Sequence, residues 1–233
     1  MADKATLVLI PGLICTGELW APQVVELADV AEVIIVDHSR TETVGELARS
    51  ILEGVEGRFA LAGHSMGGYA AFEIMRQAPE RVERLALIAT CAGLDAPEVK
   101  QRRLDFINIA KRGKFRGMSP VLLRSFVHPD RLGDQALIET VYRMAHQTGA
   151  EGFINQQKTI LSRPDSRPGL GDIKCPSLII CGLDDERTPP HLHEEMAEAI
   201  RDSELVTLAR CGHLPTLERP TAVTQVLAEW LGA

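Results

Sequence analysis

The sequence predicts an α/β fold built on a mainly parallel, six-stranded sheet that is flanked by helices. Short apolar segments alternate along the chain with longer segments of helical character, as in proteins whose parallel strands are joined by helices. Most of the short segments are apolar runs, some of them with one polar residue at the start, which is typical of strands covered on both faces. The alternation is interrupted once, between residues 94 and 170, where no strand is expected.

The six expected strands are short, and five of them are continuous apolar runs. The sixth, Glu204–Leu208, alternates between polar and apolar residues and is therefore expected at an edge of the sheet. In chain order the strands are expected at residues 6–10, 32–36, 59–62, 85–89, 177–180 and 204–208.

Helices are expected between these strands and inside the interruption. The segments of helical character between the strands are residues 18–28, 43–54, 66–78, 190–200 and 218–231. Glu98–Arg112 and Asp134–Gln147 are further helical stretches within the interruption. We therefore predict a core of residues 1–93 and 171–233, into which residues 94–170 are inserted as a helical cap.

Composition narrows the class of protein. A chain of 233 residues with 45% hydrophobic and 24% charged residues can bury a substantial core without disulfides or metal ions. Its net charge of −7 gives no reason to expect nucleic acid or an anionic membrane as a partner. Five cysteines without a C-x-x-C pair indicate a reducing compartment, and the N-terminus does not resemble a secretory signal, so a cytoplasmic location is expected. No metal site is expected, because His191 and His193 are two positions apart on a helix and do not face each other.

Charge is distributed unevenly along the chain. Residues 95–170 carry 13 Lys or Arg and 8 Asp or Glu, most densely at Lys111–Arg116, although the chain as a whole is acidic. Solvated surface charge is the expected explanation of this excess, and an acyl substrate that carries a carboxylate or phosphate is the alternative. Apolar residues of the same segment are expected either to line the substrate pocket or to form the cap's own core: Phe106, Ile109, Phe115, Met118, Leu122 and Phe126.

Residues 63–67, Gly-His-Ser-Met-Gly, have the G-x-S-x-G pattern of a nucleophilic serine. The surroundings strengthen this interpretation, since an expected strand precedes the pattern and an expected helix follows it. Gly63 and Gly67 permit a sharp turn, which places Ser65 at the carboxyl end of the sheet. The N-terminus of the following helix favours negative charge there.

A serine hydroxyl needs a base to remove its proton and a carboxylate to orient that base. His213 is the expected base, because it follows the last strand and so lies at the same edge of the sheet. His64 is expected to be a packed or hydrogen-bonded residue, because adjacent side chains diverge at a sharp turn. The acid is expected in the loop after the fifth strand, where Asp184 and Asp185 are equally suited.

With its nucleophile, acid and base in the order Ser, Asp, His, the chain resembles the α/β-hydrolase fold family. The resemblance covers nearly the whole chain and rests on residues 10–13 with Trp20 downstream, 63–68, 182–189 and 212–220. Family members usually carry G-x-x-D-x-x-x-P after the fifth strand. Aligning that pattern on Gly182 and Pro189 implies Asp185 as the acid.

The resemblance also implies an oxyanion hole made by the backbone N–H groups of Leu13 and Met66. The family usually has a His-Gly pair before the first of these donors, whereas this chain has Pro11-Gly12; the change removes a side chain and leaves the donor. Many members begin with a strand hairpin. Only five residues precede Thr6 here, so a sheet of six parallel strands without an antiparallel edge strand is expected.

These features imply a serine hydrolase that cleaves a small-molecule carboxylic ester, lactone or thioester through an acyl-enzyme, with no metal or organic cofactor. It is expected to be a monomer or a homodimer. The family also includes C–C bond hydrolases and enol-lactonases of aromatic degradation, and a slow-turnover small-molecule receptor of the same fold is the non-enzyme alternative. A haloalkane dehalogenase or an epoxide hydrolase is disfavoured, because those enzymes carry Asp at the position of Ser65.

Overall fold

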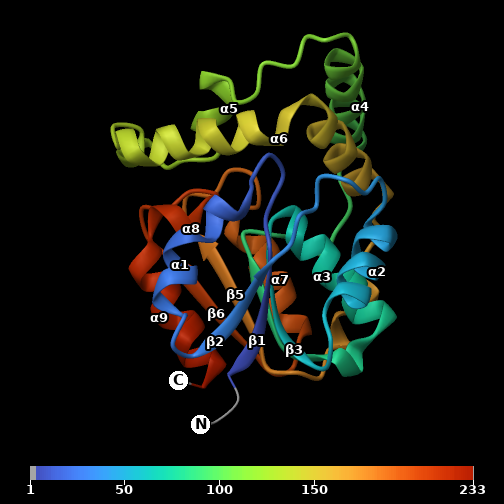
Figure 1. Ribbon diagram of the computed structural model, residues 1–233, viewed down its shortest axis with the longest axis vertical. Coiled ribbons are helices and arrows are strands. Elements are labelled where there is room, and N and C mark those ends of the chain that lie inside the picture. Colours follow the sequence, from blue (N-terminus) through green and yellow to red (C-terminus); the bar gives the residue numbers. More distant parts are fainter. Residues whose placement is uncertain (1–3, 233) are drawn as a thin grey trace.

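Six parallel strands form one sheet in the computed structural model, which describes residues 4–232 (Figure 1). The strand order is β2-β1-β3-β4-β5-β6, and every neighbouring pair is parallel. The strands are β1 (Ala5–Ile10), β2 (Ala31–Ile35), β3 (Phe59–His64), β4 (Val82–Ile88), β5 (Ser177–Gly182) and β6 (Ser203–Leu208). Each expected strand lies inside its observed counterpart or extends one residue past it. The expected fold class is therefore confirmed, and within the described residues no strand precedes β1.

The two edge strands are less buried than the strands between them. Every residue of β3 and β5 is buried, whereas β6 alternates between half-buried and exposed residues, as its sequence predicts. The apolar run of β2 predicts a strand covered on both faces, and this is wrong: β2 forms the second edge, and Ile35 is 38% exposed. A continuous apolar run indicates a strand but not its place in the sheet.

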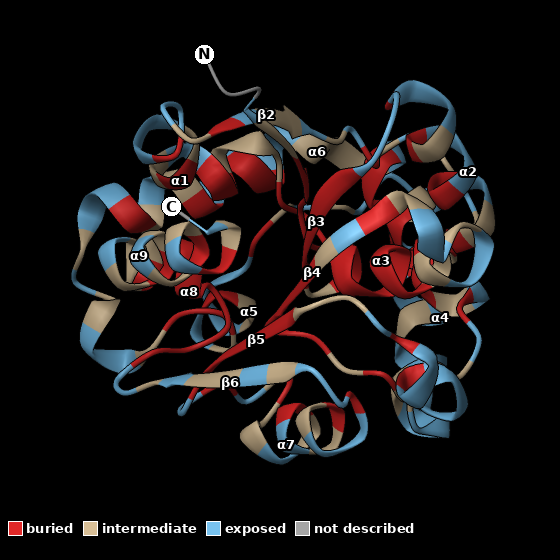
Figure 2. Ribbon diagram, turned by 90° about the horizontal axis from the view of Figure 1, so that it is seen from below, coloured by how far each residue is buried: buried red, intermediate tan, exposed pale blue. Residues whose placement is uncertain are grey.

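Helices cover both faces of the sheet (Figure 2). On one side α1 (Ala21–Glu26) packs with α9 (Pro220–Leu231), and on the other α2 (Val44–Gly54) packs with α3 (Met66–Gln77). The remaining core elements are the 3-10 turns η1 (Gly17–Trp20) and η2 (Pro79–Arg81) and the helices α7 (Pro190–Ala199) and α8 (Pro215–Glu218). The expected helix 18–28 is thus divided between η1 and α1, whereas the expected helix 218–231 corresponds to α9, which begins two residues later.

Helix α3 begins in close contact with the end of β1. A Cβ on Gly67 would lie 2.2 Å from the carbonyl oxygen of Ile10, and one on Gly63 would lie 2.4 Å from the carbonyl oxygen of Gly67. Neither position has room for a side chain. The two glycines of the G-x-S-x-G pattern therefore let the helix start directly over the edge of the sheet.

The segment between β4 and β5 contains α4 (Pro97–Lys111), α5 (Pro120–Arg124) and α6 (Gln135–Ser162), with short turns η3 (Pro129–Arg131) and η4 (Arg167–Asp172). These three helices lie together across one end of the sheet (Figure 1). Side chains of α6 bond to the loops after β1 and β2, so this is the carboxyl end.

Helix α6 continues beyond Gln147, where the sequence predicts its end. A kink at Gly149, with φ 65° and ψ −177°, interrupts the helical periodicity before the helix resumes. None of the described helices, α6 included, combines the length and the apolar character that crossing a membrane requires. The division of the chain into a core and a cap at residues 94 and 170 stays a prediction.

Candidate active site

Ser65 occupies a strained turn between β3 and α3. Its φ of 53° and ψ of −112° lie in a region that residues other than glycine seldom adopt. Its N–H donates to the carbonyl oxygen of Ile88 (2.8 Å), and its own carbonyl oxygen accepts from Oγ1 of Thr90 (2.7 Å). Strain of this kind costs about 1–3 kcal/mol and persists only where neighbouring groups enforce it. The serine remains partly exposed at the carboxyl edge of the sheet.

The structure brings three sequence-predicted residues together into one hydrogen-bonded chain. Nε2 of His213 lies 2.9 Å from Oγ of Ser65, and Nδ1 of His213 lies 2.7 Å from Oδ2 of Asp185. His213 and Asp185 are almost completely buried. Asp184 instead is exposed and lies 3.5 Å from Nε2 of His128. The geometry therefore favours Asp185 over its neighbour as the partner of the histidine.

The carboxylate of Asp185 is held in its ionised form. Burial acts to raise its pKa, but the charge of His213 and several hydrogen bonds outweigh burial and hold the pKa well below its usual range. The backbone N–H groups of Arg187 and Thr188 donate to Oδ1, and the Thr188 hydroxyl donates to Oδ2. An ionised acceptor at Nδ1 keeps the proton of the imidazole there, which leaves Nε2 free to accept the serine proton.

Glu218 fixes the loop that carries His213. One of its oxygens, Oε1, accepts from the backbone N–H groups of both Gly212 and Leu214, at 3.1 Å each. The other accepts from the N–H of His128 (2.8 Å). The side chain is completely buried, and burial raises its pKa against these hydrogen bonds. In the sequence, Glu218 stands out only as part of the segment 212–220, because its bonds on both sides of the histidine depend on how the loop folds.

His64 lies beside the same loop and does not contact Oγ of Ser65 as the base. Nε2 of His64 donates to the carbonyl oxygen of His213 (2.7 Å), and the two rings are 5.3 Å apart. Complete burial lowers the pKa of His64 to about 3. A neutral, hydrogen-bonded imidazole at this position agrees with the expectation from the sharp turn.

The two predicted oxyanion donors lie at the turn after β1 and at the start of α3. As the first residue of α3, Met66 has no partner for its N–H within the helix, and in residues 4–232 no acceptor is found for the N–H of Leu13. The peptide that carries the Leu13 N–H is held from its other side, since the Gly12 carbonyl oxygen accepts from Nε2 of His38 (2.9 Å). The assignment of Leu13 and Met66 to an oxyanion hole stays a prediction.

A residue of α6 completes the support of this turn. Ile14 has a φ of 53°, which is strained for a β-branched side chain. Its N–H donates to Oε1 of Gln156 (2.8 Å), a side chain that is buried beside His38. His38 and Gln156 were not expected as site residues. No local pattern in the sequence identifies them, because the contact with Ile14 joins positions 142 residues apart.

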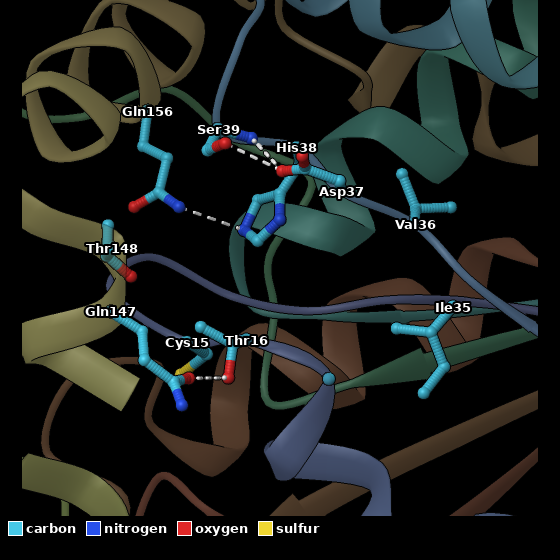
Figure 3. A pocket seen from close by; sticks show the side chains of 11 residues that line it. Cys15, Thr16, Ile35, Val36, Asp37, His38, Ser39, Gln147, Thr148 and Gln156 are labelled. Atoms are coloured by element: carbon cyan, nitrogen blue, oxygen red, sulfur yellow. Dashed lines mark hydrogen bonds between the residues drawn. The ribbon is translucent and has the colours of Figure 1, made fainter. Parts of the chain in front are cut away.

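Figure 3 shows a cavity of about 400 Å³ on the outer side of this turn, between α6 and the loops after β1 and β2. His38 and Gln156 form its inner wall, and Asp37, Ser39 and Gln147 are among its other polar residues. None of Ser65, Asp185 and His213 lines this cavity.

The expected pocket residues of the insertion have different positions. Phe126 packs edge-on against His213, with ring centres 5.3 Å apart. Phe115 and Met118 line a separate groove of about 660 Å³ within the insertion, together with Tyr142. Phe106 and Ile109 are exposed and Leu122 is half-buried against the core. Among the six residues, Phe126 is in ring contact with the imidazole.

Comparison with known proteins decides the family. The profile of the alpha/beta hydrolase family matches residues 7–226, nearly the whole chain. The chain belongs to the alpha/beta hydrolase family.

Proteins similar to this alpha/beta hydrolase are named for different substrates or types of substrate. RutD from Serratia proteamaculans, whose name describes a carbamate hydrolase, is 26% identical over 97% of this chain and 90% of its own. A 2-hydroxy-6-oxononadienedioate/2-hydroxy-6-oxononatrienedioate hydrolase from Paraburkholderia phymatum is 26% identical over 85% of this chain and 71% of its own. A thermophilic esterase from Thermogutta terrifontis with bound malate superposes with a TM-score of 0.89 at 28% identity, covering 98% of this chain and 91% of its own. The protein is thus a hydrolase of this family.

The positively charged side chains of the insertion differ in their surroundings. The cations of Lys111–Arg116 are exposed, as solvated surface charges are. Arg103 and Arg163 are instead paired with the same carboxylate, that of Asp95, at 2.6 and 2.9 Å. Within residues 4–232 no group of three or more His, Cys, Asp or Glu side chains is arranged to hold a metal ion.

Proposed function

We propose that this alpha/beta hydrolase cleaves a small-molecule carboxylic ester or lactone through an acyl-enzyme formed on Ser65. The observation that carries the proposal is the continuous hydrogen-bonded chain from Asp185 through His213 to Oγ of Ser65. A serine in a strained turn at the start of a helix, in contact with the unprotonated nitrogen of an oriented imidazole, is arranged to lose its proton as it attacks a carbonyl carbon.

The reaction has two halves that use the same groups. Oγ of Ser65 attacks the acyl carbon while Nε2 of His213 takes its proton, and the N–H groups of Leu13 and Met66 stabilise the oxyanion. Collapse of the intermediate breaks the bond to the leaving group, which receives the proton from His213. Water then repeats the sequence on the acyl-enzyme and releases the acid. Neither half requires a metal ion or an organic cofactor.

We also propose that residues 94–170 act as a cap that shapes the substrate pocket. Phe126 of this segment packs against His213, and the N–H of His213 donates to the carbonyl oxygen of Phe126 (2.8 Å). Gln156 of α6 supports the turn of the predicted oxyanion donors. The insertion therefore contacts the base and the turn that carries Leu13, so changes in it are expected to alter catalysis as well as substrate choice.

A carbamate is the second candidate substrate class. Its support is the similarity to RutD over 97% of the chain. Carbamate hydrolysis needs the same nucleophile, base and donors, and differs in the nitrogen beside the carbonyl group. Cleavage of a C–C bond, an activity that the family resemblance implies as an alternative, also remains within the reach of these groups.

Two measurements test the proposal. A fluorophosphonate probe should label wild-type protein at Ser65 and leave Ser65→Ala unlabelled. A panel of aryl esters of graded chain length, a lactone and an aryl carbamate, measured at pH 8, should show turnover by the wild type and none by Ser65→Ala, with esters or lactones preferred. Labelling without turnover would support the receptor alternative, and neither labelling nor turnover would reject the hydrolase mechanism.

A further inference from the structure

Arg187 has an unusual position two residues after Asp185. Its guanidinium carbon lies 4.3 Å from the centre of the Phe126 ring, the same ring that packs against His213. Its Nη1 donates to Oγ of Ser125 (3.2 Å). The side chain thus extends from the loop of the acid toward the insertion and ends beside the aromatic residue that covers the base.

The charge of Arg187 is not matched by an acidic side chain. In residues 4–232 no carboxylate lies within 4.0 Å of its guanidinium, whereas Arg103 and Arg163 are both paired with Asp95. Asp185 lies two residues before Arg187 and has a buried side chain. Its carboxylate oxygens already accept hydrogen bonds from His213, from Thr188 and from backbone N–H groups. Placing a cation in partly buried surroundings without an anion is costly, so an unpaired one needs an explanation.

The unpaired N–H groups of Arg187 can be reached from solvent. The residue is only partly buried. Nε and Nη2 find no acceptor among the described residues, and neither belongs to the buried polar atoms that lack a partner. One side of the guanidinium is covered by Phe126, and its open N–H groups remain accessible beside that ring.

The charge of Arg187 also acts on groups that surround Ser65. Burial is the main cause of the pKa changes at His64 and Cys15, but the positive charge of Arg187 contributes at both, acting to lower each pKa. His64 precedes the nucleophile, and Cys15 lies in the turn after β1. The guanidinium therefore lies near enough to the elbow and to the turn after β1 for its charge to act on both, and its contact with Phe126 places it one ring away from His213.

We infer that Arg187 binds a carboxylate group of the substrate, and that the acyl group cleaved by this hydrolase carries such a carboxylate at the end away from the reacting carbonyl. Two N–H groups of a guanidinium match the two oxygens of a carboxylate, and the apolar cover given by Phe126 strengthens that contact. The inference rests on the proposed function, because it places the substrate's reacting carbonyl at Ser65.

A matched pair of substrates tests the role of Arg187. The 4-nitrophenyl monoester of adipic acid and 4-nitrophenyl hexanoate have acyl chains of equal length, and only the first carries a carboxylate. Arg187→Met should lower kcat/KM for the adipate ester about 10–100-fold, mainly through KM, and change the value for the hexanoate by less than about threefold. Arg187→Lys should restore part of the preference. Arg112→Met, which removes an exposed cation of the insertion, should leave the preference for the adipate ester unchanged.

Equal losses on both esters would overturn the inference, because a structural arginine supports all substrates alike. A similar loss of preference in Arg112→Met would also overturn it in favour of the general positive charge of the insertion. Thermal unfolding of each variant identifies misfolding, and Arg187→Lys gives a second comparison if Arg187→Met does not fold.

The failure of the proposed function has a different signature. If neither ester is turned over by the wild type, the acyl-enzyme mechanism fails and the arginine site is tested by binding alone. Titration calorimetry of adipate with Ser65→Ala, with and without Arg187→Met, then decides: adipate should bind only when Arg187 is present. Binding that is equal or absent in both proteins would reject the carboxylate site.

Discussion

Nε2 of His64 donates a hydrogen bond to the carbonyl oxygen of His213, so the residue that precedes the nucleophile holds the backbone of the predicted base. The other face of His64 packs against the turn after β1, where a Cβ on Gly12 would come within 2.6 Å of Nδ1. One buried imidazole therefore contacts the elbow, the base loop and the oxyanion turn. His64 is a positioning residue, because it keeps the base loop and the oxyanion turn at a fixed distance from Ser65.

Replacing His64 by phenylalanine should lower kcat about tenfold with little change in KM. The substitution keeps an aromatic ring in the buried space but removes the donor to His213, a bond of about 1 kcal/mol whose loss also leaves a buried carbonyl oxygen unpaired. His64→Gln, which can still donate, should lose less. Steady-state kinetics on an aryl ester measures both variants, and unchanged kcat in His64→Phe would show that the base loop does not need this bond.

Asp185→Asn should lower kcat by about 10³–10⁴, whereas Asp184→Asn should change it less than threefold. The first substitution removes the ionised acceptor at Nδ1 of His213, so the imidazole loses the tautomer that it needs to act as base. The second changes an exposed carboxylate that lies beside His128. Rates measured at pH 8 on the same ester compare the two directly, and the reverse order of effects would assign the acid role to Asp184.

Gln156→Leu should lower kcat at least tenfold and leave KM within about threefold, because the oxyanion turn loses the acceptor that holds the strained Ile14 and only the transition state uses the oxyanion donors. Gln147→Leu is the matched control: Gln147 lies on the same helix and bonds to Thr16 of the same loop, but not to Ile14. Equal effects of the two variants on kcat would indicate that α6 stabilises the loop only in a general way.

The free energy of unfolding should fall as pH decreases from about 6.5 toward 4. Burial lowers the pKa of His64 to about 3 and that of His193 to about 4, so the unfolded chain binds protons in this range that the folded chain does not. Stability therefore rises with pH across the interval, and each histidine accounts for about 2 kcal/mol between pH 7 and pH 5. Below about pH 4 the lowered pKa values of Asp95 and Asp185 add a further loss, since their ion pairs need the charged form.

Urea denaturation at pH 7, 6 and 5 measures this dependence. His193→Gln should reduce it, because the amide oxygen can still accept from the N–H of Thr90 and carries no proton-dependent charge. His191→Gln is the control, since His191 is exposed on the same helix. The same slope in wild type and His193→Gln would show that the buried imidazole does not control acid stability.

The order of elements could be predicted from the sequence because strands and helices follow from short-range patterns. The strands β1, β3, β4 and β5 were predicted from apolar runs, and most of their ends were placed within a residue or two. The G-x-S-x-G pattern between a strand and a helix placed Ser65 in its turn. His213 follows from topology alone, since a residue after a parallel strand lies at the same sheet edge as Ser65. Predictions that depended on where a strand lies in the sheet were less successful, as the exposure of Ile35 in the edge strand β2 shows.

Choices between adjacent residues lie beyond such patterns. Asp184 and Asp185 are chemically alike, and the direction of each side chain depends on how the loop after β5 turns against the loop after β6. Aligning the loop with a family pattern favours Asp185, and the hydrogen bond to His213 gives the physical reason.

The sequence by itself determined the fold class, the position of the serine turn and the loops that meet there, because these depend on local periodicity, on glycines without room for a side chain and on the direction of parallel strands. Only the tertiary structure decided which residues support the site. Gln156 reaches Ile14, Glu218 brackets His213, and Arg187 stands beside Phe126 without an acidic partner. The contacts of Gln156 and Arg187 join segments that are distant in the chain, and they form only when the packing of the insertion against the core has set their distances. The contacts of Glu218 are local and depend on the conformation of its own loop.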